Sequence, residues 1–171
     1  AIGSEFPQTI FELLAERNVH YERYKDSTPG RTRSQISQTY AGSFDGAYAF
    51  SVFTHVDVGD FVPSLKFVAS MLKPGAVFLF TVFALPPYSR AKLAARQTNP
   101  PFAEQTFEQG GDVFIGNEGD RLAFMGYDIR RVEAMIWEAG LIPCAIEYGE
   151  WRCAGSSESY QDVIVCRKPL A

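Results

Sequence analysis

The chain has 171 residues, of which 46% are hydrophobic and 14% aromatic, enough apolar material for the core of one domain rather than two. Sixteen basic and twenty acidic side chains give a formal net charge of −4, so no positive field attracts a phosphate backbone, and nucleic acid is not an expected partner. The longest apolar stretch, residues 76–85, is about half the roughly 20 residues that a membrane-spanning helix requires. We therefore expect a cytoplasmic protein without a membrane partner.

The first part of the chain is expected to contain a helix, a short strand and a loop. Residues 1–6 are expected to be vector-derived, because residues 3–6 read Gly-Ser-Glu-Phe, which two adjacent restriction sites encode. Residues 7–18 carry apolar side chains at helical spacing, and residues 19–24 alternate as in a half-buried strand. The polar residues 27–43 predict a loop with a short helix.

Two runs with almost no charge form the centre of the predicted sheet. Residues 44–53, FDGAYAFSVF, are typical of a strand buried on both faces in a parallel sheet, and residues 76–83 form a second such run. Asp57 or Asp60 caps an intervening helix that residues 73–75, Lys-Pro-Gly, end. Its apolar face contains Phe61, Leu65, Val68, Ala69 and Leu72. A strand, a helix and a strand in succession predict a right-handed parallel crossover.

The second half of the chain contains an insertion, a helix and a pair of strands. Residues 84–120 interrupt the alternation of strands and helices and are predicted to be an insertion with a short helix around residues 88–96. Asp128 then caps a helix that Gly140 ends, with an apolar face of Ile129, Val132, Met135, Ile136 and Ala139. Residues 141–151 and 162–167 predict an antiparallel pair that closes the domain.

No metal site is expected. Cys144, Cys153 and Cys166 form no CxxC pair, and the two histidines, His20 and His55, complete no zinc-ligand spacing. The three cysteines are therefore predicted to be buried thiols.

Five short motifs occur in a specific order along the chain. They are Phe-Asp-Gly at 44–46, Ser-Val-Phe-Thr-His-Val at 51–56, Leu-Lys-Pro-Gly at 72–75, Glu-Ala-Gly-Leu at 138–141 and Tyr-Gln-Asp-Val at 160–163. With this order and spacing, residues 44–169 resemble the class I S-adenosylmethionine-dependent methyltransferases. The resemblance implies a sheet of order 3-2-1-4-5-7-6 whose strand seven is antiparallel.

The resemblance covers strands three to seven of that sheet. Residues 19–24 would be strand three, residues 44–53 strand four, residues 76–83 strand five, and the final pair strands six and seven. The expected fold class is therefore α/β, with residues 7–171 forming an incomplete Rossmann-like methyltransferase sheet, mostly parallel with an antiparallel C-terminal strand pair. Strands one and two, and the GxGxG-like loop that approaches the cofactor after strand one, have no counterpart.

Several residues are implied in cofactor binding. Asp26 follows the expected strand three, where a carboxylate would accept a hydrogen bond from the adenine amino group, although a solvated loop aspartate is the alternative. Ala49, Phe50 and Ser51 lie at the carboxyl end of strand four, the end at which open α/β sheets bind ligands, and simple packing is their alternative.

Four further residues are candidates for the methyl-acceptor side of the site. His55 is the candidate general base, with a hydrogen bond inside the fold as its alternative role. Tyr88, Arg90 and Tyr127 flank the insertion and could line an acceptor pocket, or else belong to the surface or the core.

The resemblance implies transfer of a methyl group from S-adenosylmethionine to an oxygen or nitrogen of a small molecule, which the insertion would select. This chain alone is expected to be incomplete or inactive. The alternative is a degenerate, non-catalytic binding or dimerisation module that binds no cofactor. A dehydrogenase-type Rossmann domain fits less well because of the antiparallel final pair. Without strands one and two, the edge of strand four predicts a homodimer, or residues 19–24 placed beside that strand.

Overall fold

The computed structural model describes residues 33–99, 106–152 and 159–170. The chain divides into two compact units, Ala1–Ile36 and Ser37–Ala171, and a short helix, α2 (Arg33–Thr39), spans their boundary. This helix confirms the one predicted within the polar residues 27–43. The predicted helix 7–18 and strand 19–24 lie outside the described residues.

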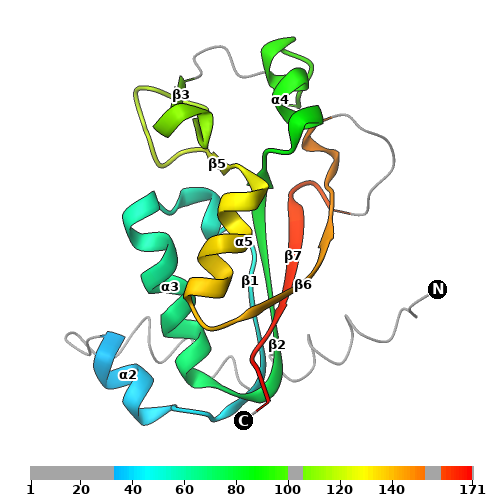
Figure 1. The fold of residues 1–171 in the computed structure, drawn as a ribbon. Helices are drawn as coiled ribbons and strands as arrows, with labels where there is room; N and C mark the ends of the chain where they lie inside the picture. The colour runs from blue at the N-terminus through cyan, green and yellow to red at the C-terminus, as the bar shows by residue number, and fades with distance from the viewer. Residues whose placement is uncertain (1–32, 100–105, 153–158, 171) are drawn as a thin grey trace. The chain divides into compact units, whose positions relative to one another are not determined.

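The main sheet of the second unit has the strand order β1-β2-β7-β6 (Figure 1). β1 (Phe44–Ala49) is parallel to β2 (Leu72–Ala84), β7 (Asp162–Arg167) is antiparallel to β2, and β6 (Ile142–Glu147) is antiparallel to β7. β1, β2 and β6 therefore run in one direction, and β7 lies between β2 and β6 in the other. This order is the 4-5-7-6 part of the expected sheet, and it confirms the predicted fold class.

Two strand boundaries differ from the prediction. β1 ends at Ala49 rather than at residue 53, because Ser51 has a φ of 54° and turns the chain into a short 3-10 helix, η1 (Phe53–His55). β2 begins at Leu72 rather than at residue 76. Gly75 has a φ of 79°, and its N–H donates to the Lys168 carbonyl at 3.0 Å, so the Lys-Pro-Gly motif is part of the strand.

Two helices build the core with one face of the sheet. α3 (Val58–Met71) is capped by Asp57, and α5 (Ile129–Glu138) is capped by Asp128, as the sequence predicted. Their apolar side chains share one buried cluster with the even-numbered side chains of β2. This helix-side core contains Phe61, Leu65, Phe78, Phe80, Val82, Val132, Ile136 and Ile164, among others. Its aromatic rings lie close together, with Phe53 and Phe80 at 4.6 Å between centroids.

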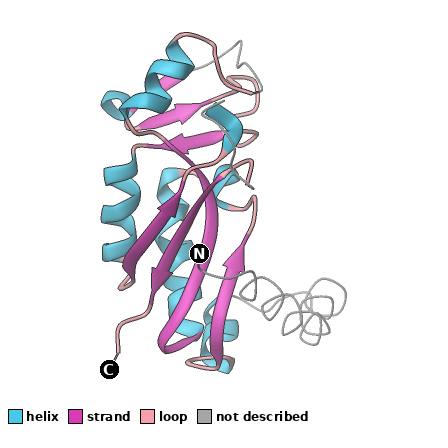
Figure 2. Cartoon of the chain, turned by 90° about the vertical axis from the view of Figure 1, so that its right-hand side faces the viewer, coloured by secondary structure: helices cyan, strands magenta, loops and turns pink. Residues whose placement is uncertain are grey.

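The insertion and the residues that follow it contain three short strands that the sequence did not predict. β3 (Thr106–Glu108), β4 (Val113–Ile115) and β5 (Met125–Tyr127) pair antiparallel, and β5 pairs in parallel with the end of β2. Figure 2 shows these short strands at one end of the long strand β2. Strands of three residues are too short to show a period-two pattern. The predicted short helix is confirmed as α4 (Pro87–Ala94).

The predicted strand over residues 141–151 stops early, at Glu147. The Gly149 N–H donates to the Asp162 side chain at 2.8 Å instead of continuing a backbone ladder. The chain then forms a 3-10 helix, η3 (Glu150–Arg152), in which Trp151 is fully buried and packs edge-on to Phe83 at 5.2 Å. The strand prediction for 148–151 was therefore wrong. The segment is fixed by the Asp162 side chain and by the N–H groups of Glu150 and Trp151, which donate to the Ser159 and Tyr160 carbonyls at 3.0 Å.

Candidate functional site

A small cavity lies where the carboxyl ends of β1 and β2 meet the start of β7. Its volume is about 200 Å³. The lining residues are Phe50, Ser51, Thr81, Ser159, Tyr160 and Gln161. Ligands of open α/β sheets bind outside the carboxyl ends of the parallel strands, so this cavity is at the expected edge of the sheet.

Three polar side chains form a hydrogen-bonded cluster in this cavity. The Ser51 N–H donates to Thr81 Oγ1 at 2.8 Å, and the Ser51 hydroxyl donates to Gln161 Oε1 at 3.2 Å. The Thr81 hydroxyl donates to the same Gln161 oxygen. Thr81 alternates along β2 with Phe80 and Val82, so it lies on the face of the strand opposite the helix-side core.

The backbone at Ser51 is strained. A φ of 54° lies in the left-handed region, which a non-glycine residue adopts at a cost of about 1–3 kcal/mol. The Thr81 hydroxyl holds this conformation by accepting from the Ser51 N–H. Strain that a specific contact maintains is characteristic of binding and catalytic sites.

His55 lies at the end of η1, outside the lining of this cavity, and its side chain is exposed. Its Nδ1 is 2.7 Å from the Leu122 carbonyl oxygen. A carbonyl can only accept, so Nδ1 carries a proton and the neutral ring has its lone pair on Nε2. The contact ties η1 to the segment before β5, and it also orients Nε2 as a proton acceptor.

The three predicted acceptor-pocket residues lie in three different environments. Tyr88 is 49% exposed on α4, with the Lys92 amine 5.5 Å from its ring centroid. Arg90 donates to Asp128 Oδ2 at 2.8 Å and to the Gly111 carbonyl, and so links α4 to the start of α5 and to η2 (Gln109–Gly111). Tyr127 is fully buried, and its hydroxyl donates to the Val56 carbonyl.

The structure thus brings two predicted residues, Phe50 and Ser51, into one cavity. Ala49 packs against the helix-side core, and Asp26 lies outside the described residues. Thr81 and Gln161 were missed by the sequence reasoning. The signal for Thr81 was a single hydroxyl inside the apolar run of residues 76–85. Gln161 carried no signal beyond its place in the Tyr-Gln-Asp-Val motif.

A buried ion pair fixes the segment that carries Gln161. The neighbouring residue, Asp162, is fully buried, and its carboxylate accepts from four donors: the Ala84 N–H at 2.7 Å, the Gly149 N–H at 2.8 Å, the Trp151 indole N–H at 2.9 Å and the Arg152 guanidinium. We call these five residues the Asp162 junction. Burial raises the pKa of the Asp162 carboxyl, and Arg152 and the N–H donors oppose that shift.

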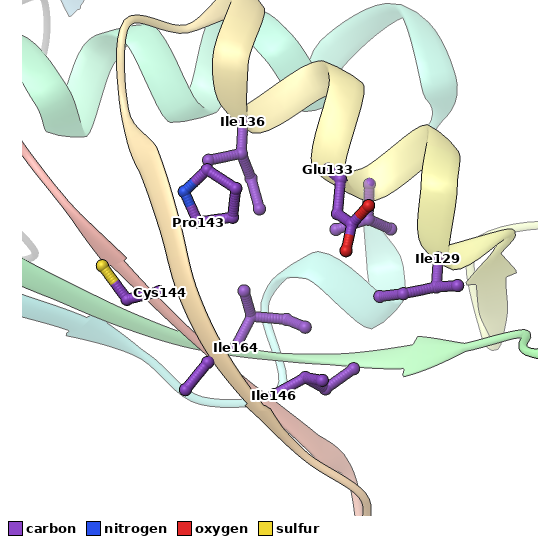
Figure 3. A pocket seen from close by; sticks show the side chains of 9 residues that line it. Ile129, Glu133, Ile136, Pro143, Cys144, Ile146 and Ile164 are labelled. Atoms are coloured by element: carbon purple, nitrogen blue, oxygen red, sulfur yellow. The ribbon is translucent and has the colours of Figure 1, made fainter.

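A second cavity, of about 240 Å³, lies between α5 and β6 at the other edge of the main sheet (Figure 3). Ile129, Glu133 and Ile136 of α5 face β6 across it. It contains none of the predicted site residues. Cys144, on this cavity's rim, is exposed.

The cysteines only partly match their predicted burial. Cys166 is a buried thiol, as predicted, and burial raises its pKa to about 12. Cys144 is exposed because β6 is an edge strand with an irregular register between Pro143 and Ala145, and Cys153 lies outside the described residues. Within the described ranges, no three His, Cys, Asp or Glu side chains are grouped so that they could hold a metal ion. No helix in those ranges is both long and apolar enough to cross a membrane.

The comparisons with known proteins are structural. No protein-family model and no curated protein matches the chain by sequence. Among solved structures, a SAM-dependent methyltransferase from Methanosarcina mazei matches 77% of this chain and 62% of its own, with a TM-score of 0.52 and 18% identity. The 1,6-didemethyltoxoflavin-N1-methyltransferase of Burkholderia thailandensis, with bound 1,6-didemethyltoxoflavin and S-adenosylhomocysteine, matches 75% of this chain and 45% of its own, with a TM-score of 0.50 and 16% identity.

These similarities establish the fold. The chain has the fold of class I SAM-dependent methyltransferases, whose cofactor is S-adenosylmethionine. The expected resemblance is therefore confirmed for the fold. The chain spans about half to three-fifths of the length of these two structures. Fold alone does not assign a reaction or a substrate.

Proposed function

We propose that this chain carries the acceptor-side half of an S-adenosylmethionine-dependent methyltransferase that methylates an oxygen or nitrogen of a small molecule. The observation that carries the proposal is the antiparallel β7 between β2 and β6, which places the Gln161 end of β7 beside the carboxyl ends of β1 and β2. A cavity with a strained serine and a polar cluster lies at that junction of strands.

Ala49, Phe50 and Ser51 are the residues that we propose contact the cofactor. They fit such a group, because the Phe50 ring is 47% exposed and the Ser51 hydroxyl is at the surface of the cavity. When bound, S-adenosylmethionine supplies an electrophilic methyl group. The protein's contribution to this reaction is mainly to position a nucleophilic acceptor against it.

His55 is the residue that we propose removes the acceptor's proton. Its Nδ1–H is held by the Leu122 carbonyl, so Nε2 is the nitrogen that can take a proton from a hydroxyl or an amine. The same contact would also serve a purely structural role. The His55→Asn variant separates the two, because the Asn amide N–H can replace Nδ1–H but has no equivalent of Nε2.

The decisive test of the methyltransferase proposal is calorimetric titration of the purified chain with S-adenosylmethionine and S-adenosylhomocysteine. Because the GxGxG-like loop has no counterpart in this chain, we expect weak binding. Ser51→Val and Phe50→Ala should weaken it further, and Trp137→Ala should leave it unchanged, because Trp137 is 58% exposed on α5 and does not line the cavity. No binding by the folded chain would mean that it is either a fragment of the enzyme or the alternative, a methyltransferase-like module without catalysis.

The test of His55 compares native and variant chains in stability and in methyl transfer to an acceptor that the native chain methylates. We expect His55→Asn to keep the free energy of unfolding within about 0.5 kcal/mol, as for surface substitutions, and to lower the rate constant of methyl transfer by about 10²-fold or more, as for loss of a general base. Full activity with unchanged stability would show that His55 has only its structural contact with Leu122. We further propose that Tyr88, Arg90 and Tyr127 contact the acceptor, that the chain forms homodimers, and that it is cytoplasmic.

A further inference from the structure

We propose that Gln161 binds the methyl acceptor through its carboxamide N–H groups, and that this acceptor is a neutral, planar molecule with a carbonyl oxygen or ring nitrogen that accepts the hydrogen bond. The inference rests on the proposed function, because it names the substrate class of the same site. Four features of the cavity carry it: the orientation of the Gln161 amide, the absence of charge among the lining residues, the two aromatic walls and the volume.

The neighbours of Gln161 fix the orientation of its amide. Thr81 is 3% exposed, and its oxygen already accepts from the Ser51 N–H, so its hydroxyl proton needs an acceptor within the protein. Gln161 Oε1 is that acceptor, and it also accepts from the Ser51 hydroxyl. A flipped amide would turn N–H groups toward both hydroxyls and leave the Thr81 proton without this acceptor.

The consequence is a pair of directed donors in the cavity. With Oε1 occupied by two hydroxyls, the Nε2 atom of Gln161 presents its two N–H groups on the other side of the amide. Gln161 lines the cavity and is half-buried, so a ligand can reach these donors. A carbonyl oxygen or an unprotonated ring nitrogen is the complementary group, whereas an N–H or O–H alone is not.

The lining favours a ligand without charge. The six residues around the cavity are two aromatics, three hydroxyl- or amide-bearing side chains in one cluster, and Ser159, and none of them is ionised at neutral pH. A carboxylate or ammonium placed there would lose water without gaining a counter-charge. The strongest charged group nearby, the Arg152–Asp162 pair, is neutralised internally and buried.

The two aromatic walls favour a flat ligand. Tyr160 is held on both sides, because its ring packs edge-on to Phe83 at 6.1 Å and its hydroxyl donates to the Asn99 carbonyl. The Phe50 ring packs against the Tyr48 ring, with 5.2 Å between the ring centroids. Both rings are more than two-fifths exposed, so aromatic surface is presented to a ligand that can stack. A cavity of about 200 Å³ suits a molecule of one or two rings.

The test measures binding of coumarin to the chain without cofactor, by ligand-observed NMR titration. Coumarin is planar and uncharged, and its oxygens only accept hydrogen bonds. We expect Gln161→Glu and Gln161→Met to weaken coumarin binding at least tenfold, and Thr81→Val to weaken it less, because it releases the Gln161 amide without removing its donors. Gln97→Glu is the matched control, since Gln97 is exposed after α4 and lies outside the cavity.

Two further measurements distinguish a specific loss of binding from misfolding of the variant. The Gln161→Glu variant is expected to bind 2-aminoquinoline, which offers donors, more tightly than the native chain does, and a misfolded protein would not gain affinity. Coumarin-3-carboxylate is expected to bind the native chain at least tenfold more weakly than coumarin.

Three outcomes would overturn the inference. They are no binding of coumarin to the native chain, equal binding by the native chain and both Gln161 variants, and tighter binding of the carboxylate than of coumarin. Because no cofactor is present, each of these outcomes is independent of the S-adenosylhomocysteine titration. A failed titration with intact, Gln161-dependent coumarin binding would reject cofactor binding by this chain alone and keep the binding site.

Discussion

The helix-side core and the Asp162 junction are both buried, but different forces hold them. The core consists of side chains such as Phe61, Phe78 and Phe80, which contribute by leaving water and by close packing. The junction consists of one carboxylate, one guanidinium and three N–H donors, all directed at the same two oxygens. Apolar contacts are non-directional, whereas each hydrogen bond to Asp162 requires a particular distance and angle.

This difference determines which region can position a ligand. A packed core tolerates volume-conserving exchanges because its contacts can rearrange, so it fixes a site only coarsely. The Asp162 junction joins the end of β2, the segment after β6 and the first residue of β7 through one side chain. Since Gln161 immediately precedes Asp162, the junction determines where the Gln161 amide lies relative to Thr81.

The largest effect is expected when one partner of the buried Arg152–Asp162 pair is removed, which tests whether the junction depends on directed contacts. Asp162→Ala leaves the Arg152 guanidinium buried without its counter-ion, and we expect a loss of about 3–5 kcal/mol in the free energy of unfolding. Arg152→Met should cost a similar amount, because it leaves a buried carboxylate. Urea denaturation followed by circular dichroism measures both.

The double variant Asp162→Ala with Arg152→Met tests whether the two groups act as a unit. We expect it to lose less than the sum of the single losses, by about 1–3 kcal/mol, because neither charge is then left unpaired. Additive losses would mean that the ion pair contributes nothing specific and that the junction behaves like the apolar core.

A second test concerns the space at Gly149. A Cβ added there would lie 2.4 Å from the Tyr160 carbonyl oxygen and 2.5 Å from the Gln161 backbone, so the two segments would have to separate. We expect Gly149→Ala to lower the free energy of unfolding by about 3 kcal/mol, as for strong overpacking, and to abolish coumarin binding. Equilibrium denaturation and the NMR titration measure these effects.

Gly59 supplies the matched control for this substitution. It lies in the first turn of α3, and a Cβ there would meet nothing within 4 Å. Gly59→Ala is therefore expected to raise the free energy of unfolding by about 0.5–1 kcal/mol, through helix propensity alone. If both alanine variants shifted stability in the same direction, the close approach at Gly149 would not be a constraint.

The same contrast explains what the sequence could predict. Residues 44–53 contain one charged side chain and residues 76–83 none, and the apolar faces of α3 and α5 repeat at helical spacing. Each of these elements is therefore indicated by about ten consecutive residues. Asp57, Asp128 and Gly140 mark helix ends through local capping chemistry, and the structure has caps and a left-handed glycine there. The motifs added the strand order, which local patterns do not encode.

The contacts that define the cavity are not local. Thr81 and Gln161 are 80 residues apart, and Ser51 and Gln161 are 110 apart, so no periodic pattern connects them. Arg152 follows a predicted strand, and no sequence pattern indicated its burial, although it is 2% exposed. Asp162 carried no local signal of its role, because its four donors come from two segments far apart in the sequence, residue 84 and residues 149–152.

A smaller effect is expected at Asp128, which combines both kinds of interaction. Burial raises the pKa of this carboxyl, but hydrogen bonds from Arg130 and Arg90 outweigh burial and lower it to about 2. A lowered folded pKa means stability that is present above about pH 4 and is lost as pH falls toward 2. The shift corresponds to about 1–2 kcal/mol, since Arg130 is exposed and partly screened.

Asp128→Asn isolates this contribution, because asparagine also caps helices and so preserves the start of α5. We expect the variant to unfold with about 1–2 kcal/mol less free energy than the native chain at pH 7, and the two stabilities to converge between pH 4 and pH 2. Arg90→Gln, which removes one of the two cations, should give an intermediate difference. Stability curves that run parallel from pH 7 to pH 2 would show that the ionised carboxylate is not what Arg90 and Arg130 stabilise, and that the insertion is anchored to α5 by packing alone.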